Sequence, residues 1–213
     1  MLFICVLLLL QLSLSDGFTR SSPFTRGLSR KVLFSTEDTE VESTPLLKEE
    51  VSFMEIRTGK IVEISVHPDP EASKLFVEKV DCGEPDGPRT IVSGLVEFCS
   101  AEDLLNKEVI VLCNLKPRAL KGITSAGMLL CAGNDDHTQV APLSPPSGVP
   151  VGELITFAGY ESAPVEPGNK ATKVWGKIAD GFVVNDDMVA TYKGIPFMTS
   201  QGVITATLKG SIS

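Results

Sequence analysis

From Val51 onward the chain alternates apolar and polar residues with the two-residue period of β-strands. The alternation runs through residues 53–68 (FMEIRTGKIVEISVHP) and residues 74–83 (KLFVEKVDCG), and residues 89–95 (RTIVSGL) form a short apolar run. Strands with one buried and one solvated face show this period. We therefore predict three β-strands in this part of the chain.

A single short helix and two more strands are predicted next. In residues 100–108 (SAEDLLNKE), Ser100 can cap a helix whose first turn carries acidic residues. The strands follow in residues 108–115 (EVIVLCNL) and, after a turn that contains glycine, in residues 125–133 (SAGMLLCAG). Three strands, one helix and two strands is the order of the OB-fold, a five-stranded barrel. We therefore expect a mainly β fold.

The first 50 residues differ in composition from the rest. Residues 2–14 (LFICVLLLLQLSL) are apolar but shorter than the roughly 20 residues of a membrane-spanning helix, which predicts a signal-like segment over residues 1–17. Residues 18–36 are basic and rich in hydroxyl groups, as in transit peptides, and residues 37–50 resemble an acidic linker. We predict that residues 18–50 are disordered.

Together these segments resemble the two-part presequence of algae with complex plastids. A plastid location is therefore expected. The alternative is a signal peptide followed by a disordered tail in a secreted protein.

Charge limits the classes of partner. The whole chain has a net charge of −8, and the part from Val51 has 14 Lys and Arg against 20 Asp and Glu. A nonspecific nucleic-acid coat is excluded, because such proteins gain affinity by neutralising phosphates. Any nucleic-acid contact must use a local basic patch.

Two windows without acidic residues supply such patches. The first, residues 109–134, carries Lys116, Arg118 and Lys121. The second, residues 167–179, carries basic residues that share one face if the segment is helical, namely Lys170, Lys173 and Lys177. Both patches are candidate phosphate contacts, although each could simply be a solvated face.

Catalytic and metal chemistry has little support in the sequence. The two histidines, His67 and His137, belong to no nucleophile or metal motif, and no phosphate-binding loop or dinucleotide fingerprint occurs. Widely spaced cysteines without a CxxC pair predict free thiols at Cys82, Cys99, Cys113 and Cys131, and the apolar runs around Cys113 and Cys131 predict that these two are buried. We expect no enzyme activity, no metal and no cofactor.

Longer motifs point to a family. HPDPEASKLFVEKVDCGE, PRTIVSGL and NLKPRALKGITSAGMLLCAG resemble the tRNA-binding domain of free bacterial tRNA-binding proteins and of methionyl- and phenylalanyl-tRNA synthetases. WGKIADGFVVNDDMVATYKGIPFMTSQGVITA resembles the C-terminal subdomain of the endothelial monocyte-activating polypeptide class, which includes synthetase cofactors. The resemblance implies an OB-fold tRNA-binding domain over residues 51–159. It also implies a small α+β subdomain over residues 160–213, packed on the barrel.

The resemblance also implies a function. Such domains grip tRNA by shape and phosphate contacts, without catalysis, and assist aminoacylation together with a synthetase. In this class the C-terminal subdomain covers the barrel surface through which shorter relatives dimerise, so we expect a monomer. The alternative is a protein-interaction module that docks a synthetase or another partner and binds RNA weakly or not at all.

Individual residues carry over from the family motif. Asn114, Lys116, Arg118 and Ser125 match the loop and strand that contact RNA, and Arg57 and Lys60 match basic positions of the first strand. Phe76 either stacks on a base or packs in the barrel. The chain departs from the family at Ala119, where lysine is usual. With the two patches, the predicted tRNA-binding set is Arg57, Lys60, Phe76, Asn114, Lys116, Arg118, Lys121, Ser125, Lys170, Lys173 and Lys177.

Overall fold

The computed structural model describes residues 46–213, which lie in one compact unit that extends over residues 43–213. The predicted signal-like segment, and all but the last residues of the predicted transit-like and linker segment, lie outside the described residues. Leu47 already belongs to the fold, because its N–H donates to the Gly159 carbonyl at 2.8 Å and its carbonyl accepts from the Glu161 N–H at 2.8 Å. The folded part therefore begins before the predicted boundary at residue 51.

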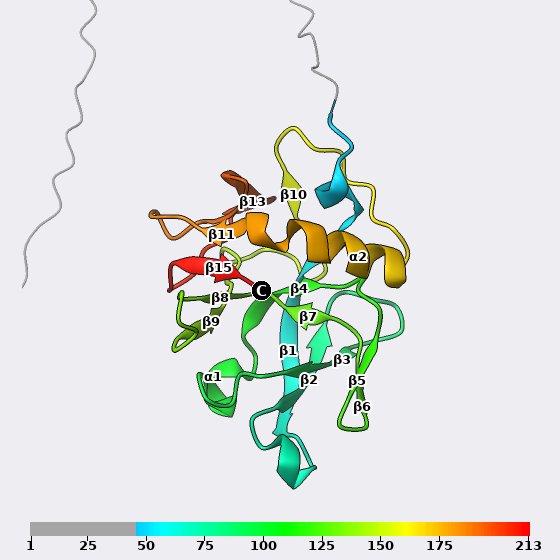
Figure 1. Cartoon of the computed structure of the whole chain (residues 1–213), viewed down its shortest axis with the longest axis vertical. Coiled ribbons are helices and arrows are strands. Elements are labelled where there is room, and N and C mark those ends of the chain that lie inside the picture. The colour runs from blue at the N-terminus through cyan, green and yellow to red at the C-terminus, as the bar shows by residue number, and fades with distance from the viewer. Residues whose placement is uncertain (1–45) are drawn as a thin grey trace, which may run out of the picture. The chain divides into compact units, whose positions relative to one another are not determined.

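Five antiparallel strands build the first sheet in the order β3-β2-β1-β4-β7 (Figure 1). Gly59 lets β1 pass close to its neighbours, because a Cβ there would lie 3.0 Å from the side chains of Val80 and Val111. The sheet curls until β3 lies beside β7, which nearly closes a barrel. The predicted mainly β fold with a five-stranded barrel is confirmed. Its strands are β1 (Ile56–Val66), β2 (Phe76–Asp81), β3 (Arg89–Ser93), β4 (Glu108–Leu112) and β7 (Met128–Leu129).

Short helical turns connect the strands as their capping residues predict. Helix α1 (Ala101–Leu104) begins after Ser100, whose Oγ accepts from the Asp103 N–H at 3.1 Å. The 3-10 turn η2 (Pro70–Ala72) follows β1, and there the Nδ1 atom of buried His67 accepts from the Asp69 N–H at 3.1 Å. His67 therefore orders this turn.

The segment predicted as a fifth strand serves two sheets. Its first part, β7, pairs with β4, and after Leu130 its second part, β8 (Cys131–Gly133), joins the other sheet. Before it, the predicted turn is a hairpin of two further strands, β5 (Arg118–Leu120) and β6 (Ile123–Ser125). Lys121 and Gly122 connect them with φ angles of 47° and 88°, the sign pattern of a two-residue type I′ turn.

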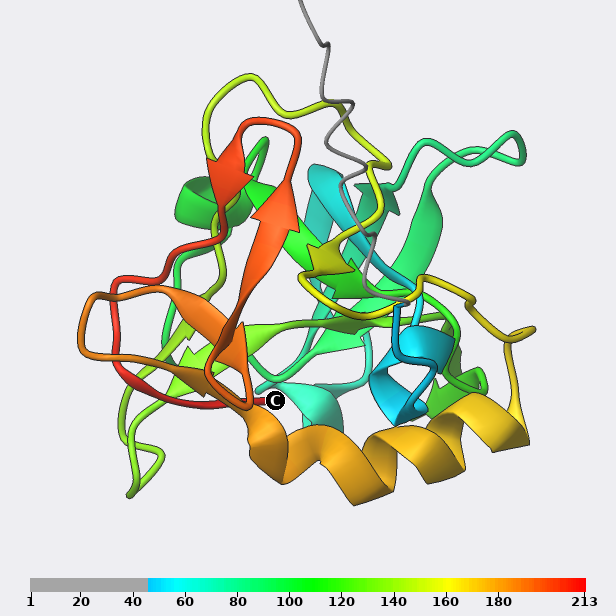
Figure 2. The same ribbon diagram turned by 90° about the horizontal axis from the view of Figure 1, so that it is seen from above.

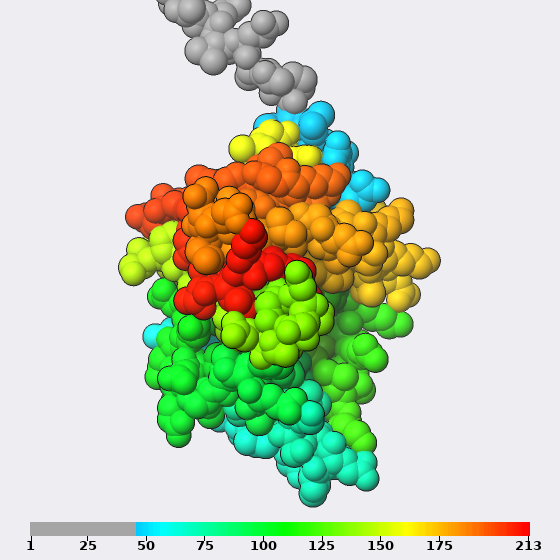
Figure 3. Space-filling view, turned by 60° about the vertical axis from the view of Figure 1, so that its left-hand side comes forward, coloured from blue at the N-terminus to red at the C-terminus, as the bar shows by residue number. Residues whose placement is uncertain are grey.

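The second sheet has the order β10-β13-β12-β11-β15-β8-β9, with β14 paired to β13. It combines barrel and C-terminal segments, and Figure 3 shows the C-terminal residues (red) lying against the orange segments on one side and the green ones on the other. Its remaining strands are β9 (Val140–Pro142), β10 (Thr156–Phe157), β11 (Phe182–Val184), β12 (Ala190–Tyr192), β13 (Ile195–Thr199), β14 (Gly202–Val203) and β15 (Gly210–Ile212).

Helix α2 (Asn169–Ile178) crosses the barrel and lies beside the 3-10 turn η1 (Glu50–Phe53), as Figure 2 shows. A third short turn, η3 (Ala179–Gly181), leads from α2 into β11. Within residues 46–213, no helix has both the length and the apolar content needed to cross a membrane.

Two apolar clusters form the core. The barrel core lies inside the strands around Ile61, Val80 and Ile91. The shared core joins barrel residues such as Ile110 and Leu130 to C-terminal residues, among them Phe182, Tyr192 and Phe197. The C-terminal segment therefore packs on the barrel, as predicted.

Candidate nucleic-acid interface

A surface hollow of about 270 Å³ lies between the β5–β6 hairpin and the start of α2. The Lys116 N–H donates to the Thr172 Oγ1 atom of α2 at 2.9 Å, and Leu115 forms a bridge with Gly168 just before the helix. These contacts bring the two basic windows together around one hollow. Its floor is mainly apolar and its rim is polar, and the lining residues are Val92, Leu115, Lys116, Arg118, Leu120, Ser125, Gly127, Met128 and Thr172.

Helix α2 presents the second basic patch to solvent. Its buried face consists of Ala171, Val174 and Ile178. Exposed lysines in the predicted spacing lie beside this buried face, and the Lys170 Nζ atom lies 5.0 Å from the centre of the Phe53 ring. The segment is helical, so the condition for a shared basic face is met at Lys170, Lys173 and Lys177.

Most cations of this region are free of carboxylate partners. Lys121 is the exception, since its Nζ atom lies 2.7 Å from Glu71 Oε2. In the part of the chain that the structure describes, no ion pair involves the exposed residues Lys116, Arg118, Lys170, Lys173 and Lys177. Their charges are therefore available to an anionic ligand.

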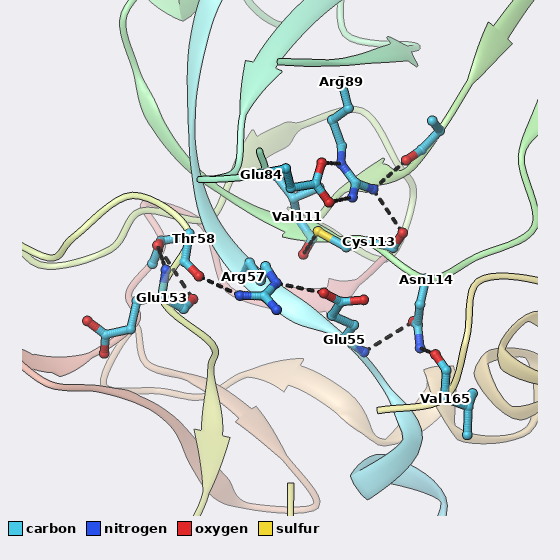
Figure 4. Close-up of polar contacts among 12 residues, drawn as sticks. Glu55, Arg57, Thr58, Glu84, Arg89, Val111, Cys113, Asn114, Glu153 and Val165 are labelled. Carbon is cyan, nitrogen blue, oxygen red and sulfur yellow. Dashed lines mark hydrogen bonds and ion pairs between the residues drawn. The ribbon is translucent and has the colours of Figure 1, made fainter. Parts of the chain in front are cut away.

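Asn114 has a structural role within the fold (Figure 4). The side chain is fully buried, and its Oδ1 atom accepts from the Glu55 N–H at 3.1 Å. Its Nδ2 atom donates to the carbonyls of Phe53 and Val165 at 2.8 Å and 2.9 Å. Asn114 thus joins the end of β4 to the N-terminal segment and to the connection that leads to α2. It presents no group to RNA in this structure.

Ser125 and Arg57 are also engaged inside the protein. The Ser125 Oγ atom accepts from the Val92 N–H at 3.0 Å and donates to the Gly127 carbonyl at 3.0 Å. Arg57 on β1 donates to Glu55 Oε1 and to the Gly152 carbonyl, both at 2.7 Å. Both side chains hold loops next to the barrel rather than project from it.

The two remaining candidates lie away from the lining of the hollow. Phe76 is 3% exposed and packs in the barrel core, which is the second of the two roles considered for it. Lys60 is partly exposed on β1, where it pairs in register with Asp81 and Glu108. The negative charges of these two neighbours reduce the positive potential at Lys60, which makes it a weaker contact for phosphate.

Arg89 supports the basic loop from beneath and was not singled out by its sequence context. Its guanidinium donates to both carboxylate oxygens of Glu84, and its Nη1 atom donates to the carbonyls of Cys113 and Ala126 at 2.8 Å and 2.5 Å (Figure 4). These bonds fix both ends of the loop that carries Lys116 and Arg118. Neighbouring residues in the sequence do not indicate this role of Arg89, because the two carbonyl groups that it binds lie 24 and 37 residues away along the chain.

A buried carboxyl group is present in the barrel. Glu78 on β2 is fully buried, its Oε1 atom accepts from the Ser93 hydroxyl, and its Oε2 atom has no hydrogen-bond partner. Burial disfavours the charged form, which raises the Glu78 pKa to about 7, although the bond from Ser93 acts in the opposite direction. Glu78 lies two residues from both Phe76 and Val80, so the period of the strand places this charged residue on the buried face.

Thiol groups are free throughout the described residues, and three of the four are buried. The Cys113 thiol donates to the Val111 carbonyl at 3.6 Å, and the interaction between the Cys82 and Cys113 thiols lowers the pKa of Cys82 and raises that of Cys113. Burial raises the pKa of Cys131 to about 12. Among residues 46–213, no group of three or more His, Cys, Asp and Glu side chains is arranged to hold a metal ion.

Comparison with known proteins adds an independent finding. The family model described as a putative tRNA binding domain matches residues 56–154. The chain is 47% identical over 153 residues to a probable methionine–tRNA ligase of Oryza sativa subsp. japonica, covering 72% of this chain and 19% of that protein. It is 40% identical over 158 residues to the aminoacyl tRNA synthase complex-interacting multifunctional protein 1 of Cricetulus griseus, covering 74% and 43%.

A solved structure matches over a longer part of the fold. The C-terminal domain of Plasmodium vivax p43 superposes with a TM-score of 0.71 at 35% identity, covering 78% of this chain and 100% of that one. This likeness includes the C-terminal subdomain as well as the barrel. The chain spans less than half the length of the two curated relatives named above.

Proposed function

We propose that this chain, which belongs to the tRNA-binding domain family, is a non-catalytic protein that binds tRNA at the hollow between the β5–β6 hairpin and α2. One observation carries the proposal. Two sequence windows that lack acidic residues meet at this hollow, and their exposed cations other than Lys121 have no carboxylate partner in the part of the chain that the structure describes. An RNA backbone is the ligand that such a local patch on an acidic body would attract.

The mechanism is electrostatic positioning. Lysine and arginine side chains neutralise phosphates and release condensed counterions, which makes affinity fall with salt. Phosphate contacts orient the RNA but carry no sequence information. We therefore expect recognition of tRNA by shape and backbone, with little preference for a particular tRNA.

A salt titration tests this function. With five unpaired cations at the interface, the slope of log affinity for bulk tRNA against log salt should be no steeper than about −5. The double variant Lys116→Ala/Arg118→Ala should bind all tRNAs more weakly and flatten the slope by about 1.5. The variant Lys74→Ala/Lys209→Ala removes the same charge elsewhere and should keep the slope.

Two results would contradict the proposal. Affinity that does not depend on salt would exclude phosphate contacts as the main source of binding. Equal weakening by the two double variants would mean that net charge, rather than this interface, is responsible.

A synthetase is the second partner that we propose. The support is similarity to segments of synthetases and to a protein named for interacting with the synthetase complex. The folded unit alone should leave tRNA, ATP and amino acid unchanged, and it should raise the tRNA affinity of a synthetase that it binds. Synthetase binding without tRNA binding would instead favour the interaction module, which the acidity of the folded part supports.

We also propose that the first 50 residues direct the chain to a plastid, on the composition of that segment alone. A fluorescent fusion of the full chain should label the plastid, and the purified mature protein should begin at or after Phe18. A purely extracellular signal would contradict this location.

A further inference from the structure

We propose that the hollow beside α2 receives one unstacked nucleobase from a non-helical part of the bound RNA, while the adjoining phosphate lies against Lys116 and Arg118. The inference rests on the proposed function and specifies how the site is used. A site that binds only phosphate groups requires exposed cations and no apolar surface. The apolar floor of the hollow therefore calls for a different part of the ligand.

The shape and chemistry of the hollow fit the flat face of a base. Its floor consists of Val92, Leu115, Leu120 and Met128, which are buried or partly buried aliphatic side chains. No aromatic ring lines it, so a base would rest on aliphatic groups, and the flexible thioether of Met128 can adapt to its outline. The guanidinium of exposed Arg118 at the rim can stack on a base as well as bind phosphate.

The two hydroxyl groups of the hollow have no proton left to donate to a base edge. Ser125 uses its hydroxyl to bind Val92 and Gly127, as described above. The Thr172 Oγ1 atom accepts from the Lys116 N–H at 2.9 Å and donates to the Gly168 carbonyl at 3.1 Å. A hydroxyl has only one proton to donate, so neither side chain has a free donor for a base edge. The hollow should accept all four bases, in agreement with recognition by shape.

The test uses residues 43–213, the compact unit with its own core, and three RNAs that share one stem. The first ends in a loop that contains 2-aminopurine, the second has the same loop without bases, and the third is a blunt duplex. We expect the first RNA to bind about tenfold more tightly than the other two. Its fluorescence should change on binding, and loops of A, C, G or U should differ by less than about threefold, because no hydroxyl reads the base.

A pair of variants locates the base. Leu120→Asn removes apolar surface from the hollow without a charge change and should abolish the preference for the loop with bases. Val66→Asn changes an apolar side chain that is 53% exposed on β1 and lies outside the hollow, and it should keep the preference. Thermal unfolding of both variants checks that they are folded.

The outcomes separate the inference from the function. Equal binding of loops with and without bases overturns the inference, and so does an unchanged preference in a folded Leu120→Asn variant. The function still stands if Lys116→Ala/Arg118→Ala weakens binding in those cases. If the unaltered protein binds no RNA, both the inference and the proposed function are wrong. If Leu120→Asn does not fold, the comparison of the three RNAs with the unaltered protein decides.

Discussion

The two cores of the molecule differ in the groups that they bury. The shared core contains a cluster of aromatic rings, in which the centres of Phe182 and Tyr192 lie 4.7 Å apart and those of Phe157 and Phe197 lie 4.9 Å apart. The barrel core contains one aromatic ring, that of Phe76, together with three buried thiols, and the barrel also buries the Glu78 carboxyl group.

This difference separates two sources of stability. Aromatic packing in the shared core holds the C-terminal segment on the barrel, and this core buries no carboxyl, amine, guanidinium or imidazole group. The barrel encloses groups whose protonation depends on their environment. Loss of C-terminal residues should therefore act through the shared core, whereas pH should act through the barrel.

The largest effect is expected from removal of residues 160–213. The deletion exposes the barrel side of the shared core, and an apolar patch of this kind drives association. Light scattering should show a monomer for residues 43–213 and a dimer or aggregate for the shortened protein. A stable dimer of the longer protein, or a well-behaved monomer of the shorter one, would contradict this role of the shared core.

Phe182→Ala should weaken the shared core without removing it. Phe182 is fully buried among aromatic rings, and such truncations typically cost 3–5 kcal/mol in the free energy of unfolding, about 4 kcal/mol here. Denaturant unfolding measures this loss. Val183→Ala on the same strand, where the side chain is 38% exposed, is the control and should change stability by less than about 0.5 kcal/mol. Equal effects of both variants would mean that the rings contribute little.

Glu78→Gln should remove a pH dependence of stability that comes from the barrel and not from the shared core. The Glu78 pKa rises from 4.5 to about 7 on folding, so its contribution to stability is greatest below pH 4.5 and is lost as the pH rises to 7. At pH 8 the variant should be more stable than the unaltered protein by up to about 3 kcal/mol, and near pH 4 the two should be alike. Urea unfolding at both pH values checks this. A constant difference would exclude Glu78 as the titrating group.

Asn114→Ala tests the junction between the two regions, with the smallest expected loss. The substitution leaves the Glu55 N–H and two carbonyls without their partner, which should cost about 2 kcal/mol. The tRNA affinity of the folded variant should be unchanged, because Asn114 is buried. Weaker binding with unchanged stability would instead place Asn114 in contact with RNA.

Local pattern was sufficient for the main elements of the barrel. Alternation and short apolar runs predicted β1 to β4, and Ser100 predicted the start of α1, because these signals depend on neighbouring residues. The β5–β6 hairpin was predicted only as a turn. Its strands have three residues each, too few for a periodic signal, although Lys121-Gly122 is compatible with the turn that joins them.

The candidate site could be predicted only in part. Charge patterning located the exposed cations, and helical spacing gave the basic face of α2. Motif matching could not tell that Asn114 and Ser125 point inward, because the groups that they bind come from distant segments. The division of the predicted fifth strand at Leu130 could not be predicted either. It depends on the pairing of β8 with β15, which lies almost 80 residues later in the chain.

The pairing of β8 with β15 also bears on how the chain is made. Synthesis produces Cys131–Gly133 well before Gly210–Ile212, so one edge of β8 has no hydrogen-bonding neighbour while the intervening residues are translated. Contacts between segments so far apart in sequence form slowly. The nascent protein therefore passes through a stage with an open sheet edge, where a chaperone would have its greatest effect on yield.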